Sequence, residues 1–330
     1  MVANLHLEVE FLSVSLTHFG QFIDHDVIST PILKESRNQI NQKTSFLDLS
    51  VTYGNTLDGQ NDLRELGTGR LQEGINRLLP TGPPGSECLA GEECFKSVLG
   101  EEGMNMFGLR SKRFGFNTLY DPSANPSTRN AFGAAAYRFG HSLVGSLVEA
   151  FNEDFTPRAR EPMEDHFFST RLIRDFTTFG PDAIARWMTT QFKSRADRFL
   201  TPAIRNRLFQ TMPGNGFDLG SLNIQRGRDH GIPSYNRWRQ FCGLQPALHF
   251  GIGPLGLTNH CASAARALQS VYSHPEDIDL FAGGMSETPV PGALVGPTFR
   301  CIIGLQFMYF KIGDRFFYEN AFVPTGFTAG

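Results

Sequence analysis

The 330-residue sequence has only five cysteines, and they form neither a CxxC pair nor a zinc-finger spacing. The sequence therefore predicts no small zinc module. No apolar run reaches the roughly 18 residues that a helix needs to span a bilayer. No Asn-x-Ser/Thr glycosylation site occurs, because proline occupies the middle of Asn125-Pro126-Ser127.

The sequence also lacks a large excess of charge of either sign. The formal net charge is -3 and the isoelectric point is near 6.3, so electrostatics give no reason to expect a nucleic-acid partner. The basic run at 110–113 is short and is typical of a solvated loop. The first residues include Glu8 and Glu10 where a signal peptide would be basic and then apolar, so no secretion signal is visible.

The chain is 40% hydrophobic and contains 30 phenylalanines, which is typical of a folded globular protein. We find no internal repeat and little strand-like alternation. The sequence predicts a mainly α fold in one compact domain, with irregular chain at 40–60 and a proline- and glycine-rich loop at 80–97. Predicted helices cover residues 9–27, 127–150, 168–178, 182–193, 195–212, 234–241 and 261–273.

The strongest predicted helix is 127–150. Asn125 and Pro126 suit a helix start, and the alanines that follow favour propagation. Within it, His141 follows Arg138 and Gly140. A glycine inside a helix costs about 1 kcal/mol relative to alanine, so it often marks the close approach of something bulky. His141 is then either a core histidine or an axial ligand beside a planar cofactor.

Two other segments concentrate polar side chains. In THFGQFIDHDV, Gln21 and His25 share one helix face, while Asp24 and Asp26 lie to either side of His25. The segment LNIQRGRDHG gathers six polar residues, which either pair locally or orient a histidine and bind an anion. These six are Asn223, Gln225, Arg226, Arg228, Asp229 and His230.

The loop TSFLDLS offers hard oxygen ligands at alternate positions: Thr44, the Phe46 carbonyl, Asp48 and Ser50. Calcium binds six to eight such oxygens. A plain surface turn is the alternative, unless a second carboxylate such as Asp26 reaches the loop.

A metal hydrolase using His18, His25 and Asp26 is a further alternative. An open zinc site needs three converging ligands, and this spacing matches no established motif.

Together these segments resemble the animal haem peroxidases, and the resemblance runs over nearly the whole chain. The motifs fall in the family's order: FGQFIDHD, TSFLDLSVTYG, CFKS, YDPSANPS, AAYRFGHSLV, LNIQRGRDHGIPSYNRWRQFCGL, FAGGMSE, VGPTFRCIIGLQF and GDRFFYEN. The sequences of these motifs are most similar to the invertebrate peroxinectin or chorion-type branch of the family.

The resemblance implies a role for each polar residue of the first motif. His25 matches the distal histidine that moves the peroxide proton, and Gln21 matches an amide lining the same pocket. Asp24 matches a carboxylate that forms an ester with a b-type haem, and Asp26 matches a calcium ligand. The other implied calcium ligands are Thr44, Phe46, Asp48 and Ser50.

On the opposite face of the haem, His141 matches the iron ligand and Asn223 its hydrogen-bond partner. Arg138 and Arg226 match arginines near the haem propionates.

The resemblance also implies a disulfide between Cys242 and Cys301, and hence a secreted protein. The implied reaction reduces hydrogen peroxide and oxidises a small donor: a halide, a phenol or a tyrosine.

The chain departs from the family pattern at two places. It begins just before the distal helix, and CFKS is followed directly by VLGEE at Ser97/Val98. In the family, several dozen residues lie between these points, with a helix reading like MHTLxLREHNR that supplies the distal arginine and a glutamate for a second haem ester. We therefore expect an internal deletion near Ser97/Val98 and part of the distal-side helices to be missing. The alternative function is a non-catalytic, calcium-binding scaffold or interaction protein.

Overall fold

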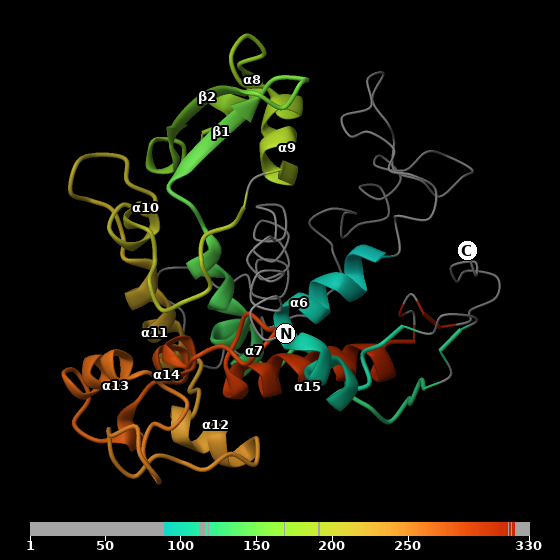
Figure 1. Cartoon of the computed structure of the whole chain (residues 1–330), viewed down its shortest axis with the longest axis vertical. Helices are drawn as coiled ribbons and strands as arrows, with labels where there is room; N and C mark the ends of the chain where they lie inside the picture. The colour runs from blue at the N-terminus through green and yellow to red at the C-terminus, as the bar shows by residue number, and fades with distance from the viewer. Residues whose placement is uncertain are drawn as a thin grey trace.

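The computed structural model describes residues 89–111, 116–117, 119–167, 169–190, 192–315, 317 and 319–320. This part of the chain is mainly helical, as the sequence predicts (Figure 1). Its α-helices are α6 (Leu89–Met106), α7 (Asn130–Ala134), α8 (Arg171–Arg174), α9 (Pro181–Thr190), α10 (Pro202–Arg205), α11 (Leu219–Asp229), α12 (Tyr235–Phe241), α13 (Ala262–Gln269), α14 (Leu280–Ser286) and α15 (Pro297–Gly313). The 3-10 helices are η1 (Ala136–Leu143), η2 (Met163–Asp165) and η3 (Pro275–Asp277), and the strands are β1 (Leu147–Phe151) and β2 (Pro157–Pro162).

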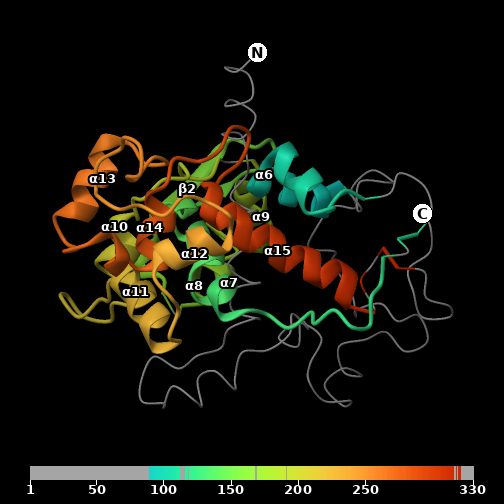
Figure 2. The same ribbon diagram turned by 90° about the horizontal axis from the view of Figure 1, so that it is seen from below.

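Helix α15 forms the centre of the main hydrophobic core. It starts with a proline in its first turn, where the missing N–H costs nothing. Phe307 and Phe310 on α15 meet Phe132 of α7 edge-on, with ring centroids 5.7 and 6.2 Å apart. Helix α6 lies along α15 in both views (Figures 1 and 2).

The predicted helix over 127–150 is wrong in extent. Asn125 accepts hydrogen bonds from the backbone N–H and the hydroxyl of Ser127, so it closes a turn instead of capping a helix. The α-helical geometry ends after Ala134, at Ala135 (φ −138°, ψ −68°), and tightens into η1. The chain then enters β1. Alanine propensity is a local preference of a few tenths of a kcal/mol per residue, and pairing with β2 overrides it.

Strands β1 and β2 form an antiparallel hairpin, from Leu147 opposite Pro162 to Phe151 opposite Pro157. Helix α9 packs against β1 and makes a small second core with it. This unit lies at one end of the molecule, away from α15 (Figure 1). It is the only sheet among the residues that the structure describes, which agrees with the expectation of little β structure.

Other predicted elements agree in part. Helices α9, α12 and α13 match the predictions for 182–193, 234–241 and 261–273 within a few residues. The predictions for 168–178 and 195–212 are wrong in length, because only α8 and the short α10 form there. The predicted loop at 80–97 is wrong from residue 89 onward, where α6 begins. The predictions for 9–27 and 40–60 lie outside the described residues.

Helix α6 runs across the Ser97/Val98 position and kinks at Gly100 (φ 72°). A positive φ of this kind favours glycine. The two halves of α6 therefore meet at a bend close to Ser97/Val98, where the sequence analysis predicts an internal deletion.

Cys242, directly after α12, and Cys301 on α15 form a disulfide with Cα atoms 6.0 Å apart. This confirms the pairing that the resemblance implies. None of the helices in the described ranges is long and apolar enough to cross a membrane.

Candidate functional site

His141 lies in the last turn of η1 and is only 6% exposed. The core helices α14 and α15 pack against η1. These neighbours hold the backbone of His141 in place, so the ring position is set by the core.

Asn223 on α11 reaches His141 from 82 residues further along the chain. Its Nδ2 lies 2.9 Å from Nδ1 of the imidazole. The Asn223 side chain is fully buried (0% exposed), and Arg138 Nη1 donates to its Oδ1 at 3.1 Å. Arg138 also donates from Nε to the Gly133 carbonyl at 3.0 Å. The structure thus brings three sequence-predicted site residues into one hydrogen-bonded chain.

The orientation of the Asn223 amide has a chemical consequence. With Oδ1 turned to Arg138, the amide N–H faces Nδ1 of His141, so Nδ1 accepts. A neutral ring whose Nδ1 accepts carries its proton on Nε2. In the opposite orientation the carbonyl accepts from Nδ1–H, which leaves a lone pair on Nε2. The two amide orientations therefore select different tautomers of His141.

Arg226, the fourth predicted residue in this region, adds positive charge. Its pKa is lowered first by burial and then by the nearby charge of Arg138, while Asp229 acts in the opposite direction. Arg226 Nη1 lies 3.7 Å from Asp229 Oδ2. The positive charges of Arg138 and Arg226 together make an environment that favours an anion.

His230 also lies in this charged region, although the family motifs imply no role for it. It is 4% exposed, and its pKa is lowered to about 4 by burial, then by Arg226 and Arg138. It stays neutral near pH 7, with Nδ1 3.4 Å from Asn130 Oδ1. Its place in the NIQRGRDH motif was the available signal, but burial cannot be read from that motif.

The position next to His141 is open to an added side-chain atom. A Cβ built on Gly140 would meet no heavy atom within 4 Å. A buried imidazole, an open position beside it and two nearby arginines are the features that a propionate-bearing haem requires. The described residues therefore fit haem.

The remaining predicted site residues lie outside the described residues. These are the distal-side and calcium candidates Gln21, Asp24, His25, Asp26, Thr44, Phe46, Asp48 and Ser50, and also His18. Within the described part of the chain, no group of three or more His, Cys, Asp or Glu side chains could hold a metal ion.

A buried network that sequence reasoning missed surrounds Glu287, the residue after α14. Its carboxylate accepts from Tyr235 Oη at 2.6 Å, Arg239 Nη1 at 3.0 Å and Thr298 Oγ1 at 2.6 Å. The Thr298 backbone N–H donates to it at 2.9 Å. This network ties α12 and α15 to the end of α14, which packs on η1. The network therefore fixes α14, which packs against the helix η1 that carries His141.

The family model described as animal haem peroxidase matches residues 32–97 and 92–330. The two matched stretches overlap at 92–97, within α6.

Curated relatives include a peroxidase-like protein of Margaritifera margaritifera, 34% identical over 446 aligned positions that cover 96% of this chain and 56% of the relative. Peroxidase-like protein 3 of Lottia gigantea is 36% identical, with 72% of this chain and 73% of the relative covered. Thyroid peroxidase of Rattus norvegicus is 39% identical over 62% of this chain and 23% of the relative.

The chain spans about half the length of the Margaritifera protein and about a quarter of the rat enzyme. The Margaritifera alignment has more positions than this chain has residues, so that relative carries residues without a counterpart here.

Solved structures share the fold. Peroxidase A of Dictyostelium discoideum superposes with a TM-score of 0.68 at 23% identity, covering 94% of this chain and 80% of that chain. A fatty acid alpha-dioxygenase of Arabidopsis thaliana gives 0.65 at 15% identity, covering 93% and 66%. With the family model matching most of the sequence, the chain belongs to the animal haem peroxidase family.

Proposed function

We propose that this chain is a haem-dependent peroxidase by lineage, with an impaired distal side. It would reduce hydrogen peroxide and oxidise a small donor: a halide, a phenol or a tyrosine. The observation that carries the proposal is the buried His141, contacted by Asn223 and lying beside the open position at Gly140.

His141 would bind the haem iron through Nε2, because Nδ1 contacts Asn223. Arg138 and Arg226 would lie near the propionates, whose charge would relieve the repulsion between them. Bound haem would supply redox-active iron that peroxide oxidises and the donor then reduces. The protein residues fix its position and its electronic properties.

A histidine must present a lone pair to a metal. We therefore propose that the Asn223 carbonyl faces Nδ1–H of His141 when haem is bound. Arg138, which donates to that oxygen in the orientation seen here, then becomes available for an anion. Haem binding and the amide orientation would be coupled in this way.

On the distal side, we carry over the roles implied by the family motifs. His25 would accept a proton from peroxide and return it to the departing oxygen, with Gln21 in the same pocket. Asp24 would be the covalent attachment point of the haem. Calcium would be held by Asp26, Thr44, Phe46, Asp48 and Ser50.

The missing distal arginine is the reason for impaired activity. Two observations support an internal deletion near Ser97/Val98: the family match breaks at 92–97, and the Margaritifera alignment is longer than this chain. Removing one preorganised donor to the charge on a leaving oxygen typically costs about 10²–10³ in rate. We therefore expect weak haem binding and poor turnover.

A second candidate function follows from the same deletion. The chain would then be a non-catalytic, calcium-binding scaffold or interaction protein that keeps the fold. Either function would be extracellular, because the Cys242–Cys301 disulfide is typical of secreted proteins.

A haem titration of the purified chain tests the proposal. We expect a Soret band that His141→Ala abolishes and His18→Ala retains. A band that survives His141→Ala would refute the assignment of the iron ligand.

Peroxide-dependent oxidation of a phenol, with His25→Ala as control, separates the two candidate functions. Slow turnover that His25→Ala removes supports an impaired enzyme. Turnover equal to that of His25→Ala supports the scaffold.

A further inference from the structure

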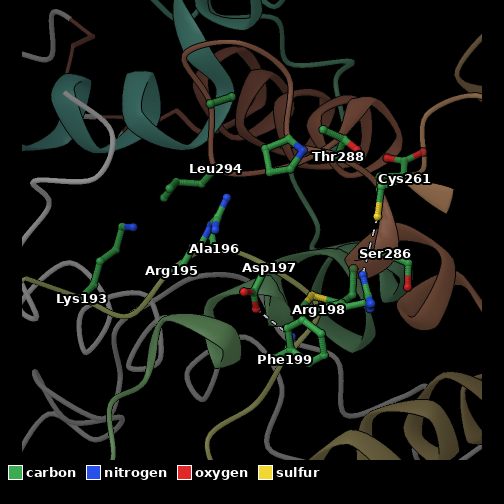
Figure 3. Close-up of a pocket in the computed structure, with 14 residues that line it drawn as sticks. Lys193, Arg195, Ala196, Asp197, Arg198, Phe199, Cys261, Ser286, Thr288 and Leu294 are labelled. Atoms are coloured by element: carbon green, nitrogen blue, oxygen red, sulfur yellow. Dashed lines mark hydrogen bonds between the residues drawn. The ribbon is translucent and has the colours of Figure 1, made fainter. Parts of the chain in front are cut away.

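A cavity whose lining does not include His141 has a volume of about 760 Å³. Its walls are the segment 193–199, Cys261 at the start of α13, and the residues that follow Met285 (Figure 3). None of its lining residues has a role in the proposed peroxidase reaction, so the cavity is a candidate site for a different ligand.

Positive charge dominates the cavity. Lys193, Arg195 and Arg198 line it, and Lys193 is only 9% exposed. Of the two acidic residues in the lining, Asp197 accepts the Phe199 backbone N–H at 2.8 Å. The other, Glu287, is fully buried and engaged with Arg239. The charges of Arg195 and Arg198 in the lining favour an anionic ligand.

An unpaired thiol stands in the wall of this cavity. Cys261 is exposed; its Sγ lies 3.2 Å from Ser263 Oγ and 3.8 Å from Arg198 Nη1. Figure 3 shows Arg198 and Cys261 facing each other. The hydrogen bond with Ser263, then the backbone N–H of Ala264 and, to a lesser extent, the nearby Arg198 lower the Cys261 pKa to about 7. About half of a thiol with that pKa is thiolate at pH 7, and the thiolate is the nucleophile.

We propose that this cavity binds small disulfides that carry carboxylates, and that Cys261 forms a mixed disulfide with them. Arg195 and Arg198 would bind the carboxylates, and this would place the disulfide next to the sulfur of Cys261. The Cys261 thiolate attacks one sulfur, a new S–S bond forms, and the second half leaves as a thiolate that takes up a proton. One disulfide is exchanged for another, so no further oxidant is needed.

The surrounding charge also argues against pairing between two copies of the chain. A second molecule would bring its own Lys193, Arg195 and Arg198 toward the first, and like charges repel. The Cys242–Cys301 bond places the chain where disulfides persist, so small disulfides are plausible partners for an exposed thiol there.

Charge selectivity tests the proposal on the full chain, without haem. The chain is incubated with glutathione disulfide, which is anionic, or with cystamine, which is cationic. The rate of modification is followed by mass spectrometry of the peptide that contains Cys261. We expect faster modification by glutathione disulfide, and none on this peptide in Cys261→Ser.

Arg195→Glu changes the cavity charge without touching the sulfur, and Arg266→Glu makes the same change on α13 outside the cavity. Arg195→Glu should lower the ratio of the glutathione to the cystamine rate about tenfold, while Arg266→Glu leaves it within about twofold. The ratio cancels any effect on the thiolate fraction. Faster reaction with cystamine in the unmodified chain, or equal changes in the two variants, would overturn the proposal. So would modification confined to other cysteines.

Discussion

Replacement of Glu287 by alanine should destabilise the protein strongly. Glu287 is fully buried, as is most of Arg239, with side-chain exposures of 0% and 4%. Burial raises the pKa of the Glu287 carboxyl, while Thr298, Tyr235 and Arg239 act in the opposite direction. The carboxylate is therefore held in place by these partners, and it is the counter-charge of Arg239.

The expected loss follows from what Glu287→Ala leaves behind. Arg239 keeps contacts with the Gln245 carbonyl and Tyr235 Oη, but its buried charge loses its counter-charge. Breaking a buried pair by removing one partner costs about 3–5 kcal/mol. Glu287→Gln keeps the shape and one carbonyl oxygen, but its amide nitrogen would face the Thr298 N–H, so it should cost about 1–3 kcal/mol.

Urea unfolding followed by circular dichroism measures the loss of unfolding free energy in both variants. An unchanged m-value shows that the surface exposed on unfolding is the same in each variant. Glu102→Ala is the matched control, because Glu102 also pairs with an arginine, Arg300, but is 74% exposed. It should cost less than about 1 kcal/mol. If Glu287→Ala lost no more free energy of unfolding than Glu102→Ala, the account of this network would be wrong.

Three further predictions follow from other contacts. Asn223→Asp places a carboxylate 2.9 Å from Nδ1 of His141. A haem-loaded sample should then show an iron reduction potential lower by about 60–120 mV, which corresponds to a ten- to hundredfold change in the equilibrium constant for reduction. An unchanged potential in a spectroelectrochemical titration would contradict this role of the Asn223–His141 contact. The double variant Cys242→Ser with Cys301→Ser removes a link between residues 59 apart in the sequence. The free energy of unfolding should then fall by about 4 kcal/mol. A fall below about 1 kcal/mol would contradict a stabilising role for this disulfide. The pKa values of His230 and His260 are lowered by burial from 6.5 to about 4. The unfolded state therefore binds protons first, and stability that is complete above pH 6.5 should decline as pH falls toward 4. Denaturant midpoints across this range measure the decline, and His260→Gln should flatten it.

The sequence predicts the fold class because the family motifs run along nearly the whole chain, and it predicts short helices where helical patterning is clear, as in α12 and α13. It misplaces the region around His141 because alanine propensity there competes with strand pairing between β1 and β2. Local preference of this kind is weaker than tertiary packing.

Long-range partners are the part that spacing cannot supply. His141 and Asn223 are 82 residues apart, and only the motif resemblance joined them before the structure. Asp229 pairs with Arg226, as expected for a local pair. Arg228 binds Asp279, which lies 51 residues further along the chain, at 2.7 Å. Pairs across distant helices depend on packing, which the sequence pattern does not encode locally.

The most direct test of the central claim is the rate of peroxide reduction by the haem-loaded chain, measured beside a complete member of the family. We expect haem bound through His141 but turnover lower by at least about a hundredfold, because we propose that the segment with the distal arginine is deleted. Turnover near that of the complete relative would contradict the account.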